Sequence, residues 1–261
     1  MSSNAGRVGV LRELLAGGME VEPKDAAAGA EALRAQAEAV KDCCKCGLCS
    51  ERTQVVFGVG SPIADLMFVG EGPGYHEDRL GEPFVGRAGK LLTELLAGIG
   101  LTRDDVYIAN VVKCRPPENR DPLPDEIEAC SPHLMDQIAV IRPRVVCTLG
   151  RFATHLLAGT ELSITAIHGK AKDVTLAGVQ TVIFPVFHPA AALYTPANRT
   201  VLEEDCGKLR KLLSMKPGAV AEGPPTDRSA VDQPDEPALP ESPAIVFRRD
   251  STGGEKQLPL W

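Results

Sequence analysis

The sequence predicts an α/β fold in which a mostly parallel sheet carries helices on both faces. Apolar runs typical of strands occur at residues 66–69, 106–112, 145–149 and 182–187. Helical patterns alternate with them, at residues 89–99, 124–141, 151–157 and 200–213. Because strands that alternate with helices form parallel sheets covered on both sides, this order is typical of three stacked layers.

The composition fits a chain with a packed core and no membrane span. Of the 261 residues, 44% are hydrophobic and 24% are charged. No apolar run reaches the roughly 18 residues that a membrane span needs, and the first residues lack the pattern of a secretory signal. We therefore expect a cytoplasmic protein without a membrane partner. The net charge of -7 argues against a broadly basic nucleic-acid-binding surface but allows a local basic groove.

Shifts in composition divide the chain into three parts. Residues 1–42 form an N-terminal extension, in which residues 27–40 are rich in strong helix formers and predict an amphipathic helix. Residues 43–216 hold the alternating strands and helices. Residues 217–261 contain eight of the 21 prolines and few large apolar side chains, so they predict a disordered acidic tail.

Cysteines form the first candidate site. Four crowd into seven residues and two follow at a distance: Cys43, Cys44, Cys46, Cys49, Cys114 and Cys130. In a reducing compartment such a group indicates metal binding. Cys43 and Cys46 have a spacing that lets two thiolates reach one metal centre, and a set of four suits zinc or an iron–sulfur cluster. Spacing alone does not separate the two metals, and it leaves Cys44 and Cys49 as possible substitutes. We expect Cys147 and Cys206 to be core residues.

The ends of the predicted strands carry the second candidate site. Glu71-Gly72-Pro73-Gly74 follows the first strand, Asn110 lies at the end of the second and His188 follows the last. Ligands of parallel sheets bind beyond the carboxyl ends of the strands. Glycines there let a backbone approach a ligand closely, although a glycine-rich turn by itself is equally typical of a structural turn.

Three strings in order carry a family resemblance: GEGPGYHEDRLGEPFVGRAGKLL at 70–92, YIANVVKCRPPENRDPLPDE at 107–126 and FPVFHPAAAL at 184–193. Together with Cys43-x-x-Cys46 they closely resemble the family-four, iron–sulfur uracil-DNA glycosylases over about residues 43–213. The resemblance implies the three-layer uracil-DNA glycosylase fold and excision of uracil from single- or double-stranded DNA in a bacterial cytosol or nucleoid. It also implies a 4Fe-4S cluster on Cys43, Cys46, Cys114 and Cys130.

The resemblance implies a role for each residue of the second site. Phe84 matches the aromatic residue that stacks on uracil, and the backbone of Gly72 and Pro73 matches the pocket lining. Asn110 matches the side chain that reads the uracil edge. His188 matches the imidazole that stabilises the anion formed as the bond breaks.

Two glutamates are candidates for the acidic group. Glu71 lies in the first string, and Glu77 is placed either to orient water and exclude the methyl of thymine or simply as an exposed glutamate at a helix start. The water-positioning aspartate of other glycosylase families falls at Gly72. Among the remaining histidines, His168 stands where relatives tend to place arginine, which makes a contact with DNA possible, and the others suit surface or packing positions.

Two other functions fit the same residues. A non-catalytic adaptor that binds DNA or a clamp would retain the fold, and a hydrolase of free nucleotides would use the same pocket. The set of Phe84, Asn110 and His188 favours the enzyme over the adaptor. We expect the chain to act as a monomer.

The tail carries one more motif. Gln257, Leu258, Leu260 and Trp261 in QLPLW resemble the pentapeptide with which bacterial proteins bind the sliding clamp. Trp261 is the only tryptophan of the chain, and tryptophan is a favoured interface anchor. We therefore expect the tail to tether the protein to the replication clamp.

Overall fold

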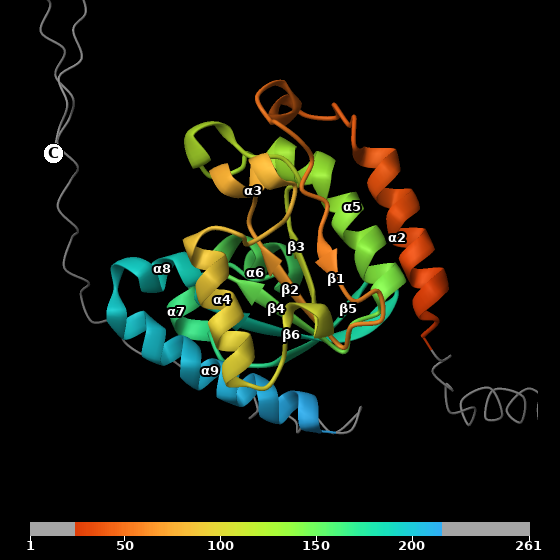
Figure 1. Ribbon diagram of the computed structural model, residues 1–261. Helices are drawn as coiled ribbons and strands as arrows, with labels where there is room; N and C mark the ends of the chain where they lie inside the picture. Colours follow the sequence, from red (N-terminus) through yellow and green to blue (C-terminus); the bar gives the residue numbers. More distant parts are fainter. Residues whose placement is uncertain (1–23, 216–261) are drawn as a thin grey trace, which may run out of the picture. The chain divides into compact units, whose positions relative to one another are not determined.

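The computed structural model describes residues 24–215, and a six-stranded sheet lies at the centre of this part (Figure 1). In chain order the strands are β1 (Val59–Gly60), β2 (Leu66–Gly70), β3 (Tyr107–Asn110), β4 (Val145–Leu149), β5 (Lys172–Leu176) and β6 (Val179–Val186). Across the sheet their order is β1-β3-β2-β4-β6-β5. The four inner strands run parallel, whereas β1 and β5 pair antiparallel at the edges. The predicted mostly parallel sheet is thereby confirmed.

Helices cover both faces of this sheet. The α-helices are α2 (Ala26–Val40), α3 (Tyr75–Leu80), α4 (Arg87–Gly98), α5 (Pro124–Ile141), α6 (Arg151–Ala158), α7 (Ile164–Ile167), α8 (Pro189–Tyr194) and α9 (Pro196–Ser214). Short 3-10 turns lie at Gly47–Ser50, Arg103–Asp105 and Pro117–Asn119. In Figure 1, α2 and α5 lie on one side of the sheet, and α4 and α9 lie on the other. The structure thus has the three layers that the alternation of strands and helices predicts.

Alternate side chains of β2 enter two hydrophobic cores, one on each face of the sheet. Met67 and Val69 pack with α2, α5 and α6, whereas Leu66 and Phe68 pack with α4 and α9. Successive side chains of a strand point to opposite faces, so a strand buried on both sides is apolar throughout. All five residues of β2 are buried. Leu33 of α2 belongs to the first of these cores, so the N-terminal helix packs against the α/β domain.

Local chemistry sets where the helices begin. The Asp25 carboxylate accepts the backbone N–H groups of Ala27 and Ala28 and so caps α2. Pro124 occupies the first turn of α5, and Glu126 accepts the N–H of Leu123 while it pairs with the Arg120 guanidinium. The helices predicted at 27–40 and 124–141 form with nearly those boundaries.

Three elements differ from the sequence prediction. The run at 106–112 ends as a strand at Asn110, because the N–H groups of Val111 and Val112 bond to the carbonyls of Gly70 and Glu71, in the turn after β2. The edge strands β1 and β5 are not predicted by any apolar run. β5 alternates between exposed and half-buried residues, since an edge hairpin has only one face to bury.

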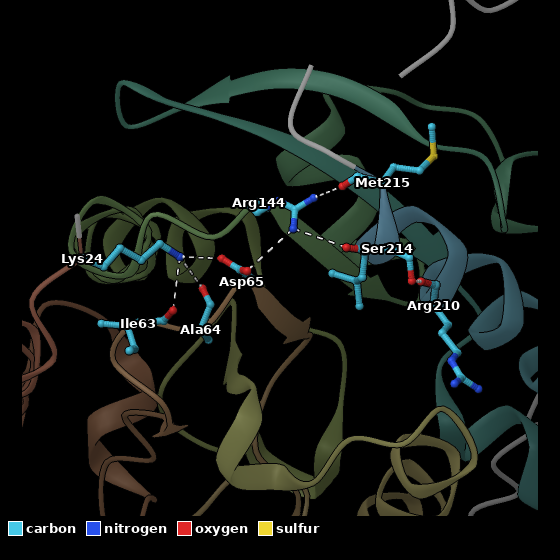
Figure 2. A network of polar contacts seen from close by, with 9 residues as sticks. Lys24, Ile63, Ala64, Asp65, Arg144, Arg210, Ser214 and Met215 are labelled. Atoms are coloured by element: carbon cyan, nitrogen blue, oxygen red, sulfur yellow. Dashed lines mark hydrogen bonds and ion pairs between the residues drawn. The ribbon is translucent and has the colours of Figure 1, made fainter. Parts of the chain in front are cut away.

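Two residues on opposite sides of Asp65 connect the beginning and the end of the described chain to the sheet (Figure 2). Lys24 Nζ donates to the carbonyls of Ile63 and Ala64 and pairs with the Asp65 carboxylate at 3.1 Å. Arg144 also pairs with Asp65 and donates to the carbonyls of Leu213 and Met215, at the end of α9. Asp65 precedes β2 and Arg144 precedes β4, so this network lies at the amino ends of the parallel strands.

Some predictions concern residues outside the described part. The acidic tail at 217–261 and its clamp-binding motif at 257–261 lie there and stay predictions. Among residues 24–215, no helix is long and apolar enough to cross a membrane.

Candidate active site

Asn110 and Gly70 meet at the carboxyl ends of two neighbouring strands. The register of β2 and β3 places them directly opposite each other. Asn110 is buried, yet its side-chain oxygen has no hydrogen-bond partner within residues 24–215. A buried polar atom without a partner is costly and is rare in native proteins. The Asn110 amide is therefore a candidate ligand-binding group.

The missing side chain of Gly70 provides the space beside this amide. A Cβ atom at Gly70 would lie 2.5 Å from Asn110 Oδ1 and 2.6 Å from Phe84 Cζ, much closer than real contacts of a Cβ. The Phe84 ring and the Asn110 amide thus converge over a glycine. The sequence shows Gly70 as one of several glycines of the turn, and only the fold reveals this role.

Phe84 adopts an unusual backbone conformation. Its φ is +55°, in the left-handed region that a bulky residue adopts only under constraint. Its side chain is nearly buried. Gly89 lies so close that a side chain there would overlap the Phe84 carbonyl. The loop therefore fixes the direction in which the aromatic ring points.

Two charged side chains hold this loop from either side. The Arg103 guanidinium donates to the carbonyls of Pro83 and Phe84, at 2.7 and 3.1 Å. Glu77 Oε1 accepts the N–H groups of Val85 and Gly86, at 3.0 and 2.9 Å, at the start of α4. Sequence reasoning missed Arg103, because the contact joins residues about 20 positions apart and follows no motif. Glu77 acts here on the loop backbone.

His188 lies against the same ring. The centroids of the His188 and Phe84 rings are 5.6 Å apart, and the ring planes are tilted by 32°. His188 caps α8, and its Nδ1 accepts the N–H of Ala190 at 3.1 Å. An Nδ1 that accepts carries no proton, so the neutral imidazole has its N–H at Nε2. Gly150, after β4, packs against His188 Cβ.

Burial determines the charge of His188. Loss of hydration lowers the pKa of His188 to about 4, although nearby Glu77 acts in the opposite direction. The imidazole is consequently neutral at pH 7 and offers one N–H donor.

Glu71 follows Gly70 directly and is half-buried. Burial raises the pKa of Glu71 to about 7, the charge of Asp121 adds to this and that of Arg151 opposes it. The neighbouring turn is tightly packed: a Cβ at Gly72 would lie 2.8 Å from Val112 Cγ2, and Pro73 is buried. The turn after β2 therefore combines a close backbone approach with one carboxyl that titrates near neutrality.

The eight cysteines separate into three groups. Around one small pocket the fold brings together the four sulfur-bearing residues Cys43, Cys46, Cys114 and Cys130. Cys44 and Cys49 do not line this pocket, and their thiols contact each other instead. Cys147 and Cys206 are buried in the core beside α9. The geometry thus distinguishes Cys43 and Cys46 from their neighbours, which spacing alone does not do.

N–H donors contact two of these sulfurs. The Lys113 N–H donates to Cys130 Sγ at 3.2 Å, and Arg52 donates to Cys114 Sγ at 3.4 Å. His133 Nε2 lies 3.9 Å from Cys43 Sγ. Across residues 24–215, no three His, Cys, Asp or Glu side chains converge closely enough to hold a single metal ion.

His168 lies near the candidate site but is held by other groups. Its Nδ1 pairs with the buried carboxylate of Asp205 at 2.6 Å, and its ring packs on Phe187, the residue before His188. Lys208 pairs with the same carboxylate at 2.8 Å. These contacts connect α9 to the segment that carries His188.

The fold and this site define an α/β protein in which an aromatic ring, an amide and a neutral imidazole come together at the carboxyl ends of parallel strands. Comparison with known proteins identifies the family to which the chain belongs. Residues 57–210 match the Uracil DNA glycosylase superfamily. The chain is 52% identical over 180 residues to the type-4 uracil-DNA glycosylase of Sulfurisphaera tokodaii. The aligned region covers 67% of this chain and 82% of that protein.

Other relatives have the same name. Identity is 50% over 186 residues with the type-4 enzyme of Saccharolobus solfataricus, covering 69% of this chain and 86% of that one. Identity is 48% over 181 residues with the type-4 enzyme of Archaeoglobus fulgidus, and the aligned region covers 68% of this chain and 91% of that one. The chain belongs to the type-4 uracil-DNA glycosylases, enzymes of DNA repair.

We expect Gly70→Ala to reduce the rate of uracil excision by about 100-fold. The added methyl group must displace either Asn110 or Phe84, and a shift of about 1 Å at a reacting centre lowers the rate by on the order of 100-fold. Single-turnover release of uracil from an oligonucleotide measures the effect. Gly98→Ala is the matched control, since a Cβ there meets nothing within 4 Å. Equal rates for both variants would show that the space above Gly70 does not serve the substrate.

Proposed function

We propose that this glycosylase binds a flipped-out deoxyuridine with its base between Phe84 and Asn110 and hydrolyses the N-glycosidic bond with the help of His188. The reaction releases uracil and leaves an abasic site in DNA. The observation that carries the proposal is the buried, unpartnered Asn110 oxygen beside Phe84 and above Gly70. A glycosylase needs such a pocket because it reads its base outside the helix.

Asn110 supports discrimination between uracil and cytosine. Its amide has one acceptor and one donor end, which match the ring N–H and the adjacent carbonyl of uracil. Cytosine has the opposite order of donor and acceptor, so it would leave buried polar atoms unpaired. The Phe84 ring supplies stacking, worth roughly 1–3 kcal/mol for a base, and the Gly72–Pro73 backbone lines the pocket.

His188 supports departure of the base. As the bond breaks, negative charge develops on uracil, and the Nε2–H of a neutral imidazole is a donor for its O2 oxygen. A donor that is already in place stabilises this charge without reorganisation in the transition state. The N–H of Ala190, bonded to Nδ1, keeps the imidazole in the tautomer that this role needs.

Glu71 suits the role of orienting and activating the attacking water. Its pKa of about 7 lies near the working pH, where a general base is most efficient. Glu77 has one carboxylate oxygen bonded to two loop N–H groups, so we assign it the positioning of Phe84. The alternative roles that the sequence allows for Glu77, orienting water and excluding thymine, fit its contacts less well.

The decisive experiment compares chemistry with binding. We expect Asn110→Ala and His188→Ala each to lower single-turnover uracil excision by on the order of 100-fold, since each removes one preorganised group. Affinity for abasic-site DNA should change far less, because the lost contacts are to the base. Excision by both variants at the wild-type rate would contradict the site assignment.

The pH dependence distinguishes the two titrating groups. We expect the single-turnover rate to rise with pH up to about 7, as Glu71 loses its proton, and to level off above it. Glu71→Gln should lower the rate and remove this inflection. Because the pKa of His188 is about 4, no further inflection is expected near the ordinary histidine value of 6.5. An inflection that persists in Glu71→Gln would exclude Glu71 as the base.

We also propose that Cys43, Cys46, Cys114 and Cys130 hold a 4Fe-4S cluster. Support comes from four thiols around one pocket, from N–H donors to two of the sulfurs and from the type-4 relatives. When bound, the cluster cross-links the segment after α2, the segment after β3 and α5. We assign it this structural role, with the chemistry of excision left to the residues at the strand ends.

Iron analysis tests the cluster. We expect anaerobically purified protein to contain about four iron atoms per chain, as this cluster type requires. Cys130→Ser should lose iron and unfold at lower denaturant concentration, whereas Cys44→Ala should retain both iron and stability. One zinc per chain without iron would reject the proposal, and so would loss of iron in Cys44→Ala but not in Cys130→Ser.

A further inference from the structure

Tyr75 lies between two arginine side chains on the surface beside the pocket. Its ring is 5.6 Å from the Arg79 guanidinium carbon and 5.3 Å from that of Arg115, measured to the ring centroid. Arg79 also donates to the Tyr75 hydroxyl at 2.9 Å. Tyr75 is 49% exposed, which is high for an aromatic residue. We call these three residues the Arg–Tyr–Arg stack.

Neither arginine of this stack has an acidic partner. The ion pairs formed by residues 24–215 involve other side chains, and none includes Arg79 or Arg115. Both guanidiniums nevertheless have fixed positions, because each interacts with the face of the tyrosine ring. Two held but unneutralised positive charges are typical of a site for an anion.

Arg115 is held by a residue in a segment whose backbone is strained. Arg115 Nε donates to the side-chain oxygen of Asn119 at 2.8 Å. Asn119 and Glu118 have φ values of +56° and +54°, two successive non-glycine residues in the left-handed region. Such strain is retained only where the surrounding structure imposes it, and it is concentrated at functional sites.

The stack adjoins the base pocket. Tyr75 comes two residues after Pro73, and Arg115 comes five residues after Asn110. The two segments are packed together, since a Cβ at Gly72 would lie 2.8 Å from Val112 Cγ2 and 3.7 Å from Pro116 Cδ. Figure 1 shows α3, which carries Tyr75 and Arg79, near the carboxyl end of β3. A nucleotide whose base occupies the pocket has its phosphates at this rim.

We propose that Arg79 and Arg115, held by Tyr75, bind backbone phosphates of the DNA strand next to the flipped nucleotide. The guanidinium fork matches two phosphate oxygens, and its fixed position reduces the entropy lost on binding. The stack gives an acidic protein the local positive charge that DNA binding needs. This inference rests on the proposed function, because it takes DNA as the substrate.

The salt dependence of DNA binding tests the proposal. Each phosphate contact to duplex DNA contributes about 0.9 to the slope of log K against log salt concentration. We expect Arg79→Gln and Arg115→Gln each to reduce this slope by about that amount for duplex DNA with a tetrahydrofuran abasic site, and the double variant by about twice as much. Arg210→Gln, an exposed arginine on α9, is the matched control and should leave the slope unchanged.

Variants of Tyr75 test whether DNA binding depends on the arginines being held by the ring or only on their charge. Tyr75→Phe keeps the ring and should bind almost as well as wild type, whereas Tyr75→Ala releases both arginines and should weaken binding several-fold with no change in net charge.

Three results would overturn the proposal: unchanged slopes in folded Arg79→Gln and Arg115→Gln, an equal reduction in Arg210→Gln, or wild-type affinity in Tyr75→Ala. Arg79 is exposed and contacts no cysteine, so Arg79→Gln keeps the test valid if Arg115→Gln fails to fold. Failure of the wild-type protein to release uracil would reject the proposed function itself, and that assay is independent of the slopes.

Discussion

The absence of a side chain at Gly70 is the constraint on which the candidate site depends. The register of β2 and β3 places Asn110 opposite this glycine, and the Phe84 ring approaches it from the loop before α4. Close packing of a ring and an amide over bare backbone requires that both be held rigidly. Arg103 and Glu77 supply this rigidity through the loop backbone, and Gly89 supplies the room for the strained turn.

How much the sequence predicts differs between fold and site. The inner strands and the long helices follow from apolar runs, because buried elements need apolar side chains on every face that packs. The edge strands β1 and β5 escape prediction, since pairing at an edge buries little surface. In the site, the order of three strings identifies Asn110, Phe84 and His188. Arg103 and the left-handed backbone of Phe84 arise only from tertiary contacts, and no local pattern marks them.

The cysteine pocket and the strand ends belong to one continuous segment. Asn110 ends β3, and Lys113, Cys114 and Arg115 follow within five residues, so whatever fixes Cys114 also limits the movement of its neighbours. Lys113 is buried and donates to the Asn110 carbonyl and to the Gln137 side chain of α5. The cysteine pocket and the strand end at Asn110 thus share a short length of backbone that these contacts hold in place.

The polar network around Asp65 determines on which side of the sheet the described part of the chain begins and ends. Lys24 and Met215 are both attached at the amino ends of the parallel strands, whereas Asn110 and His188 lie at the carboxyl ends. The described part of the chain therefore begins and ends on the side of the sheet opposite the candidate site. A label or an immobilising support attached at Lys24 or Met215 would therefore lie on the side of the sheet opposite the strand ends that carry Asn110 and His188.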